Sequence, residues 1–103
     1  MDDNKAVITV ALRTPFGKYR GALSTSRPDD LLAMLMKQLL DKYPQLDPTV
    51  IDDIIIGDSN GAGEDNRNIA RMSSLLAGIP VSVPGMTINR LCGSGAEVII
   101  RAA

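Results

Sequence analysis

Histidine and tryptophan are absent from this 103-residue chain, and cysteine occurs once, at Cys92. A single cysteine cannot form an intramolecular disulfide, so we expect a reducing compartment, the cytoplasm. Because there is no histidine, cysteine–histidine or serine–histidine chemistry would have to take its base from outside these residues. This absence limits the chemistry that the chain could complete alone.

Long runs of like residues are also missing. No block of five like charges occurs and the formal net charge is −1, so we expect no nucleic-acid partner. No apolar run approaches the ~18 residues of a transmembrane helix, so we expect no membrane partner. Hydrophobic residues make up 45% of the chain and charged residues 22%, which is typical of a globular α/β domain.

The order of periodic segments predicts an α/β fold. Three short apolar runs predict buried strands, at residues 6–12, 54–57 and 86–91. Apolar residues three and four positions apart, together with capping signals, predict helices at residues 28–43, 66–77 and 96–103. The order β-α-β-α-β-α favours a layered arrangement. The second run is apolar throughout, which favours an inner strand of a parallel sheet covered by helices.

Individual residues refine these helices. Ser26 is a candidate cap for the start of the first helix, and Gly78 for the end of the second. The second helix is expected to bury Ile69, Met72, Leu76 and Ala77. The third has only eight residues and ends without a capping residue, so we expect residues 1–103 to be a partial domain that stops inside an element.

Cys92 lies in the segment Asn89-Arg90-Leu91-Cys92-Gly93-Ser94-Gly95, where a predicted strand gives way to a helix. Such a turn projects a side chain beyond the sheet edge and places it at a helix N-terminus, where the helix dipole favours an anion. The thiolate is the nucleophilic form of cysteine, and a helix N-terminus lowers the pKa of a thiol. The flanking glycines let a substrate approach the backbone, whose free N–H groups could donate to an oxyanion.

A lone cysteine is also often a small buried hydrophobe. The flanking glycines and the strand–helix junction favour a nucleophile, whereas the missing histidine counts against it. From the residues alone, both interpretations of Cys92 stay open.

Nearby charged and polar residues are expected to have structural roles. Arg67 and Arg71, four positions apart on one predicted helix, are typical of a solvated or interface-facing pair rather than of a phosphate site. Asn89 and Arg90 are expected to brace either the turn before Cys92 or a subunit contact, and Glu97 to act as a helix-terminal charge.

The segment VPGMTINRLCGSGAEVII, residues 83–100, resembles the region around the acyl-accepting cysteine of thiolases. Three earlier segments are similar to the same family in order and spacing, at residues 13–21, 46–57 and 63–80. The sequence Glu-Asp-Asn-Arg-Asn at residues 64–68 is most similar to the corresponding segment of thiolases that act on 3-oxoadipyl-CoA. The resemblance spans nearly all of residues 6–103. It implies the layered αβαβα thiolase fold, of which this chain would be the first β-α-β-α-β-α portion.

The resemblance implies a two-step acyl transfer with Cys92 as the catalytic nucleophile. Cys92 would attack the keto carbon of a 3-oxoacyl-CoA, acetyl-CoA would leave, and a second CoA would collect the shortened acyl group. CoA and acyl-CoA are then substrates, with no permanently bound cofactor and no metal. The backbone N–H of Cys92 is the one oxyanion donor that the resemblance carries over.

The same resemblance implies that further parts of the enzyme lie beyond this chain. The family's activating histidine and second cysteine lie far downstream, so we expect the chain alone to be inactive and the full-length protein to be a homo-oligomer, a dimer or tetramer. Two other functions stay open at this point. One is a non-catalytic, thiolase-like dimerisation module, and the other is a ketoacyl synthase. The sequence Cys-Gly-Ser-Gly favours a thiolase over a ketoacyl synthase.

Overall fold

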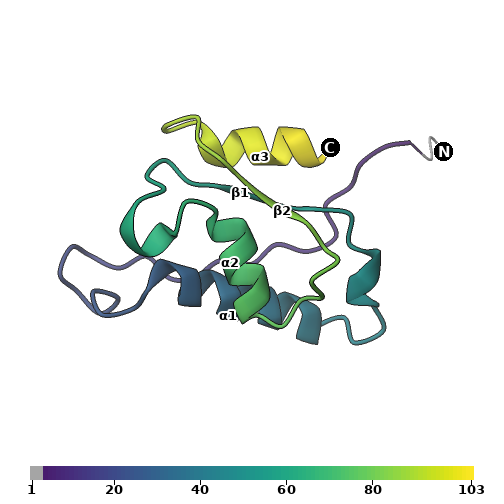
Figure 1. The fold of residues 1–103 in the computed structure, drawn as a ribbon, viewed down its shortest axis with the longest axis horizontal. Helices are drawn as coiled ribbons and strands as arrows, with labels where there is room; N and C mark the ends of the chain where they lie inside the picture. The colour runs from purple at the N-terminus through teal and green to yellow at the C-terminus, as the bar shows by residue number, and fades with distance from the viewer. Residues whose placement is uncertain (1–3) are drawn as a thin grey trace.

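A two-stranded parallel sheet lies between helices in the computed structural model, which describes residues 4–103 (Figure 1). The strands are β1 (Ile54–Gly57) and β2 (Gly85–Ile88). Helices α1 (Pro28–Asp41) and α2 (Ile69–Leu76) lie on one face, and α3 (Ser94–Ala102) lies on the other. Two short 3-10 turns, η1 (Pro48–Val50) and η2 (Gly63–Asp65), complete the elements. The arrangement is the expected layered α/β fold.

The two strands are joined by a crossover through α2, and their register pairs Ile54 with Gly85 and Gly57 with Ile88. The predicted parallel sheet is therefore confirmed. Within residues 4–103, β1 has one hydrogen-bonded neighbour, so its position as an inner strand stays a prediction. Since the strands are parallel, the segments that follow both of them emerge at the same edge of the sheet.

The prediction of a first strand at residues 6–12 is wrong. The segment forms no strand, and Val7 and Ile8 are 76% and 79% exposed. A strand needs a neighbour to pair with its backbone, and within the described residues this segment pairs with neither β1 nor β2. The hydroxyl of Tyr43 donates a 3.3 Å hydrogen bond to the Thr9 carbonyl, a contact that does not specify a strand.

The helices depart from their expected bounds for local reasons. Helix α1 begins at Pro28 as predicted, but its cap is Arg27 rather than Ser26, and the Arg27 side chain makes no capping hydrogen bond. Helix α2 begins three residues later than predicted because Asn66 and Arg67 are left-handed, with φ of 56° and 65°. The predicted cap at Gly78 is confirmed: its φ is +79°, and a Schellman motif is closed by the N–H groups of residues 78 and 79, which donate to the carbonyls of residues 75 and 74.

Helix α2 buries small residues where two of the predicted large ones are exposed. Ile69 and Ala77 are buried as expected, but Met72 and Leu76 are 41% and 55% exposed. The fully covered positions are Ala70, Ser73 and Ser74. Small side chains let α2 approach α1 and β2 closely, so size decided the inward face more than hydrophobicity did.

A buried carboxylate joins the start of α1 to the segment before α2. Asp29, 4% exposed, accepts two 3.1 Å hydrogen bonds from the Arg27 guanidinium and one of 3.0 Å from Asn66 Nδ2. Its backbone carbonyl accepts the Ser73 hydroxyl at 3.1 Å. The hydrogen bonds from Arg27 lower the pKa of Asp29 below its ordinary value. One acidic residue thus fixes where α1, the left-handed segment and α2 meet.

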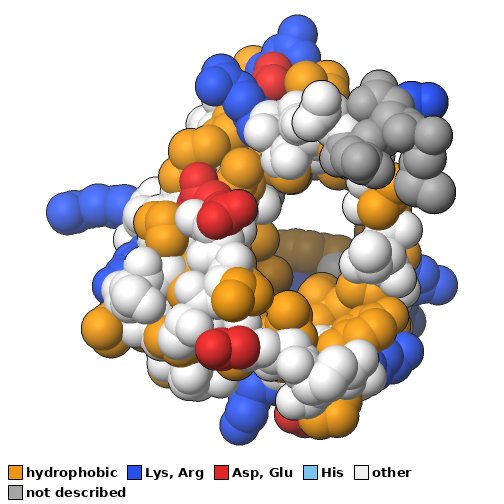
Figure 2. All heavy atoms as spheres, turned by 90° about the vertical axis from the view of Figure 1, so that its right-hand side faces the viewer, with side chains coloured by type: hydrophobic (Ala, Val, Ile, Leu, Met, Phe, Trp, Pro, Cys, Tyr) orange, Lys and Arg blue, Asp and Glu red, His pale blue; other side chains and the backbone are white. Residues whose placement is uncertain are grey.

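Apolar side chains remain on the surface at the end of the molecule where both termini lie. Figure 2 faces this end and shows a hollow with hydrophobic side chains around it. An open cleft there is lined by the N-terminal segment and the last turn of α3, at Ala6, Val7, Ile8, Val10, Ala11, Ile99, Ala102 and Ala103. On α3, Ile99 and Ile100 are more than 60% exposed. No helix within residues 4–103 is long and apolar enough to cross a membrane.

We expect the chain to self-associate in solution, because exposed neighbouring apolar groups of this kind form association surfaces. Light scattering coupled to size exclusion should give a mass above that of one chain. The Ile99→Lys and Ile100→Lys substitutions should lower it, because each places a charge on the exposed face of α3. A sharp monomer peak at micromolar concentration would contradict the prediction.

Candidate functional site

Cys92 is exposed on a turn between β2 and α3. The predicted placement at a strand–helix junction is confirmed, although β2 ends at Ile88, three residues earlier than predicted, and α3 begins at Ser94 instead of Ala96. The turn therefore spans residues 89–93. The thiol lies at the sheet edge where the parallel strands end, and it is open to molecules approaching from solvent.

Ser94 closes this turn through its side chain. It is 5% exposed, and its Oγ accepts the Arg90 N–H at 2.7 Å and donates to the Leu91 carbonyl at 2.7 Å. Within residues 4–103 the Arg90 N–H has no other acceptor, whereas the Leu91 carbonyl also accepts the Ser94 backbone N–H at 3.1 Å. No role for Ser94 is predicted from the sequence. The position of Ser94 in the sequence could have predicted this role, because the side chain of a serine at the first residue of a helix can hydrogen-bond to the chain that precedes the helix.

Leu91, directly before Cys92, has a left-handed backbone with φ of 47°. This conformation costs a residue with a Cβ about 1–2 kcal/mol. Surrounding hydrogen bonds hold it: Asn89 Oδ1 accepts the Leu91 N–H at 2.9 Å, and the Gly93 N–H donates to the Arg90 carbonyl at 2.9 Å. The strained residue reverses the chain so that Cys92 stands at the tip of the turn.

Ion pairs link the turn to the helix that follows it. Arg90 Nη1 lies 3.2 Å from Glu97 Oε1, and Arg101 Nε lies 3.5 Å from the other oxygen of Glu97. Asn89 Nδ2 donates a 3.3 Å hydrogen bond to the Ser59 carbonyl, which joins the turn to the loop after β1. The expectation that Asn89 and Arg90 brace the turn is therefore confirmed, and Glu97 serves as the partner of two arginines.

The surroundings of Cys92 suit a reaction that develops negative charge. The cap of α3 is Gly93, so the thiol lies next to the positive end of the helix dipole. Within residues 4–103, the Cys92 N–H donates no hydrogen bond, which leaves it available to an oxyanion. The described residues contain no group of three or more acidic or cysteine side chains that could hold a metal ion. A histidine base would have to come from outside these residues, since the chain has no histidine.

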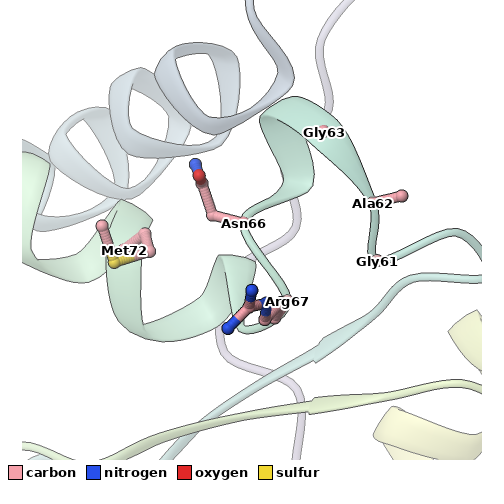
Figure 3. A pocket seen from close by; sticks show the side chains of 6 residues that line it. All are labelled: Gly61, Ala62, Gly63, Asn66, Arg67 and Met72. Carbon is pink, nitrogen blue, oxygen red and sulfur yellow. The ribbon is translucent and has the colours of Figure 1, made fainter.

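A separate open cavity of about 650 Å³ lies beside the left-handed segment before α2 (Figure 3). It is lined by Gly61, Ala62, Gly63, Asn66, Arg67 and Met72. Figure 3 shows Asn66 pointing toward α1 and Arg67 pointing away from it. The predicted pairing of Arg67 with Arg71 on one helix face is wrong because Arg67 precedes α2. Arg71 instead donates to the Val83 and Val81 carbonyls, at 2.8 and 3.2 Å, and fixes the connector to β2.

Comparison with known proteins identifies relatives of one kind. A family model for the thiolase N-terminal domain matches residues 6–103. A 3-oxoadipyl-CoA/3-oxo-5,6-dehydrosuberyl-CoA thiolase from Escherichia coli is 57% identical over 99 residues, covering 96% of this chain and 25% of that protein. A beta-ketoadipyl-CoA thiolase from Acinetobacter baylyi is 52% identical over 98 residues, covering 95% of this chain and 24% of that protein.

A solved structure agrees with these sequence matches. The acetyl-CoA acetyltransferase of Bacillus anthracis superimposes with a TM-score of 0.79 and 38% identity, over 93% of this chain and 24% of that one. This chain therefore spans about a quarter of the length of the relatives that it matches.

Replacing Ser94 with alanine should loosen the turn. The substitution leaves the Arg90 N–H without its acceptor and removes one of the two donors to the Leu91 carbonyl, which should lower the free energy of unfolding by about 1–3 kcal/mol. Urea denaturation at one fixed protein concentration measures the change. Ser82→Ala is the matched control, because Ser82 is exposed and makes no hydrogen bond among the described residues. Equal stability of the two variants would show that the hydroxyl of Ser94 does not hold the turn.

Proposed function

The chain belongs to the thiolase family, and on that premise we propose that it supplies the nucleophile of a thiolase. Such an enzyme is an acyltransferase that moves an acyl group between a cysteine thioester and CoA. The observation that carries the proposal is the exposed thiol of Cys92, held on a braced turn at the start of a helix. Residues 1–103 then form the first part of the thiolase N-terminal domain.

The substrate proposed for the whole enzyme is a 3-oxoacyl-CoA, and 3-oxoadipyl-CoA is the favoured one. Support comes from the names of two relatives more than 50% identical to this chain, which refer to 3-oxoadipyl-CoA or beta-ketoadipyl-CoA. The Glu-Asp-Asn-Arg-Asn segment at residues 64–68 agrees with that choice. CoA and its esters act as substrates, so no permanently bound cofactor is required.

The proposed reaction begins when the Cys92 thiolate adds to the 3-keto carbon of the substrate. The bond between the second and third carbons of the acyl chain then breaks, and its electron pair leaves on the acetyl-CoA fragment, which takes up a proton. The shortened acyl group stays on Cys92 as a thioester. The thiol of a second CoA attacks this thioester, loses its proton to a base and restores free Cys92.

In this scheme, residues of the chain hold the reacting atoms in place. The Cys92 N–H would stabilise the oxyanion of each addition step. It is free to do so because it makes no hydrogen bond within residues 4–103. The general base and most CoA contacts are proposed to come from the remaining three-quarters of the enzyme. We place the enzyme in the cytoplasm as a dimer or tetramer.

We predict that Cys92 becomes acylated in a complete enzyme. The test is a chimera in which this chain replaces the aligned 99 residues of the Escherichia coli relative. The chimera is incubated with an acyl-CoA, digested and mapped by mass spectrometry. The thioester should lie on Cys92, and Cys92→Ala should lower thiolysis by several orders of magnitude. A label on another residue, or full activity of Cys92→Ala, would contradict the assignment and favour a non-catalytic module.

The 103-residue chain alone should show no thiolysis, because it lacks a histidine and a second cysteine to move protons. The assay follows CoA-dependent loss of a 3-oxoacyl-CoA, with the chimera as the positive control. Turnover by the chain that disappears in Cys92→Ser would mean that a base within these residues suffices.

A further inference from the structure

We propose that Gly57, the last residue of β1, is a positioning residue for Cys92. Its missing side chain leaves the space in which the first turn of α3 lies, and so it sets where the turn that carries the thiol stands. The kinetic consequence rests on the proposed function of Cys92, whereas the geometric consequence does not.

The contact between Gly57 and α3 is a contact with backbone. A Cβ placed on Gly57 would lie 2.7 Å from both the carbonyl carbon and the carbonyl oxygen of Ser94, and 3.0 Å from the Gly95 nitrogen. Carbon atoms in proteins pack at ~3.5–4.0 Å. All three neighbours belong to one peptide unit at the start of the helix, so no flexible side chain can move aside.

The strand cannot easily yield instead. Gly57 pairs with Ile88 at the end of the parallel ladder, and the next residue, Asp58, donates its N–H to the Ile88 carbonyl at 2.9 Å. These bonds fix Gly57 against β2. The start of α3 is the part that has to move when a methyl group is added.

Movement of the peptide unit after Ser94 reaches the thiol through a short series of contacts. The Ser94 hydroxyl bonds to the Arg90 N–H and the Leu91 carbonyl, the two groups that close the turn around Cys92. Displacing Ser94 therefore displaces the turn or breaks it. Restoring ordinary contact distances from 2.7 Å requires a shift of about 1 Å.

Gly85 offers a matched control at the other end of the same strand pair. A Cβ there would lie 3.1 Å from the Arg71 nitrogen and 3.2 Å from the Ala70 carbonyl carbon, which are backbone atoms of α2. Gly57→Ala and Gly85→Ala thus place the same methyl group against the backbone of different helices. Of these two helices, only α3, which faces Gly57, carries the Cys92 turn on its N-terminal side.

The first measurement uses the 103-residue chain and does not depend on thiolase activity. The rate of Cys92 alkylation by iodoacetamide is recorded between pH 6 and 9 for wild type, Gly57→Ala and Gly85→Ala, and in urea for the unfolded chain. Wild type and Gly85→Ala should share one pH profile, and Gly57→Ala should depart from it without reaching the unfolded rate. A Gly57→Ala profile that matches either wild type or the unfolded chain would overturn the proposal.

The second measurement uses the chimera with the Escherichia coli relative. Gly57→Ala should lower kcat by about 10²-fold with little change in KM for CoA, since a displacement of about 1 Å costs roughly that much. Gly85→Ala should keep the kcat of the parent per folded molecule, as measured by circular dichroism. Equal losses in the two variants would reduce Gly57 to a stability role. If the parent chimera is not acylated at Cys92, the proposed function fails instead, and the alkylation profiles alone decide the role of Gly57.

Discussion

The parallel pairing of β1 with β2 is the constraint on which the rest of this structure depends. It requires a crossover, which α2 provides, and it brings the segments after Gly57 and Ile88 to one edge of the sheet. The hydrogen bond from Asn89 to the Ser59 carbonyl joins those two segments. With only four residues in each strand, the pairing relies on helices from both faces to keep its register.

Polar contacts shape the Cys92 turn more than hydrophobic ones do. Leu91 is 71% exposed, so its strained backbone receives little compensation from burial. The compensation comes from the hydroxyl of Ser94, the amide of Asn89 and the ion pair between Arg90 and Glu97. The thiol of Cys92 is exposed, and hydrogen bonds can hold the backbone around it without covering it.

The sequence predicted the elements whose local signals agree with their packing. Residues 28–41 carry a proline at the first turn and an apolar stripe, and residues 54–57 carry an unbroken apolar run, so both elements appear where expected. Residues 6–12 carry an equally strong strand composition, but pairing partners are a tertiary property that composition does not contain.

The candidate site was predictable to a similar degree. Glycines around Cys92 indicated the junction between strand and helix, and the family resemblance supplied its role. The left-handed Arg67 carries no sequence signal, because only glycine, asparagine and aspartate favour that conformation. The roles of Ser94 and Gly57 depend on distances between elements, which no spacing along the chain reveals.

The hydrogen bonds and ion pairs that close the Cys92 turn come from residues 89–97 and from Ser59. Most of the residues that determine the conformation of the turn therefore lie in one short segment of the sequence. Substitutions elsewhere on the surface can accumulate without removing the hydrogen bonds and ion pairs around Cys92. A scaffold of this kind can vary at its surface while the turn that carries the thiol stays unchanged.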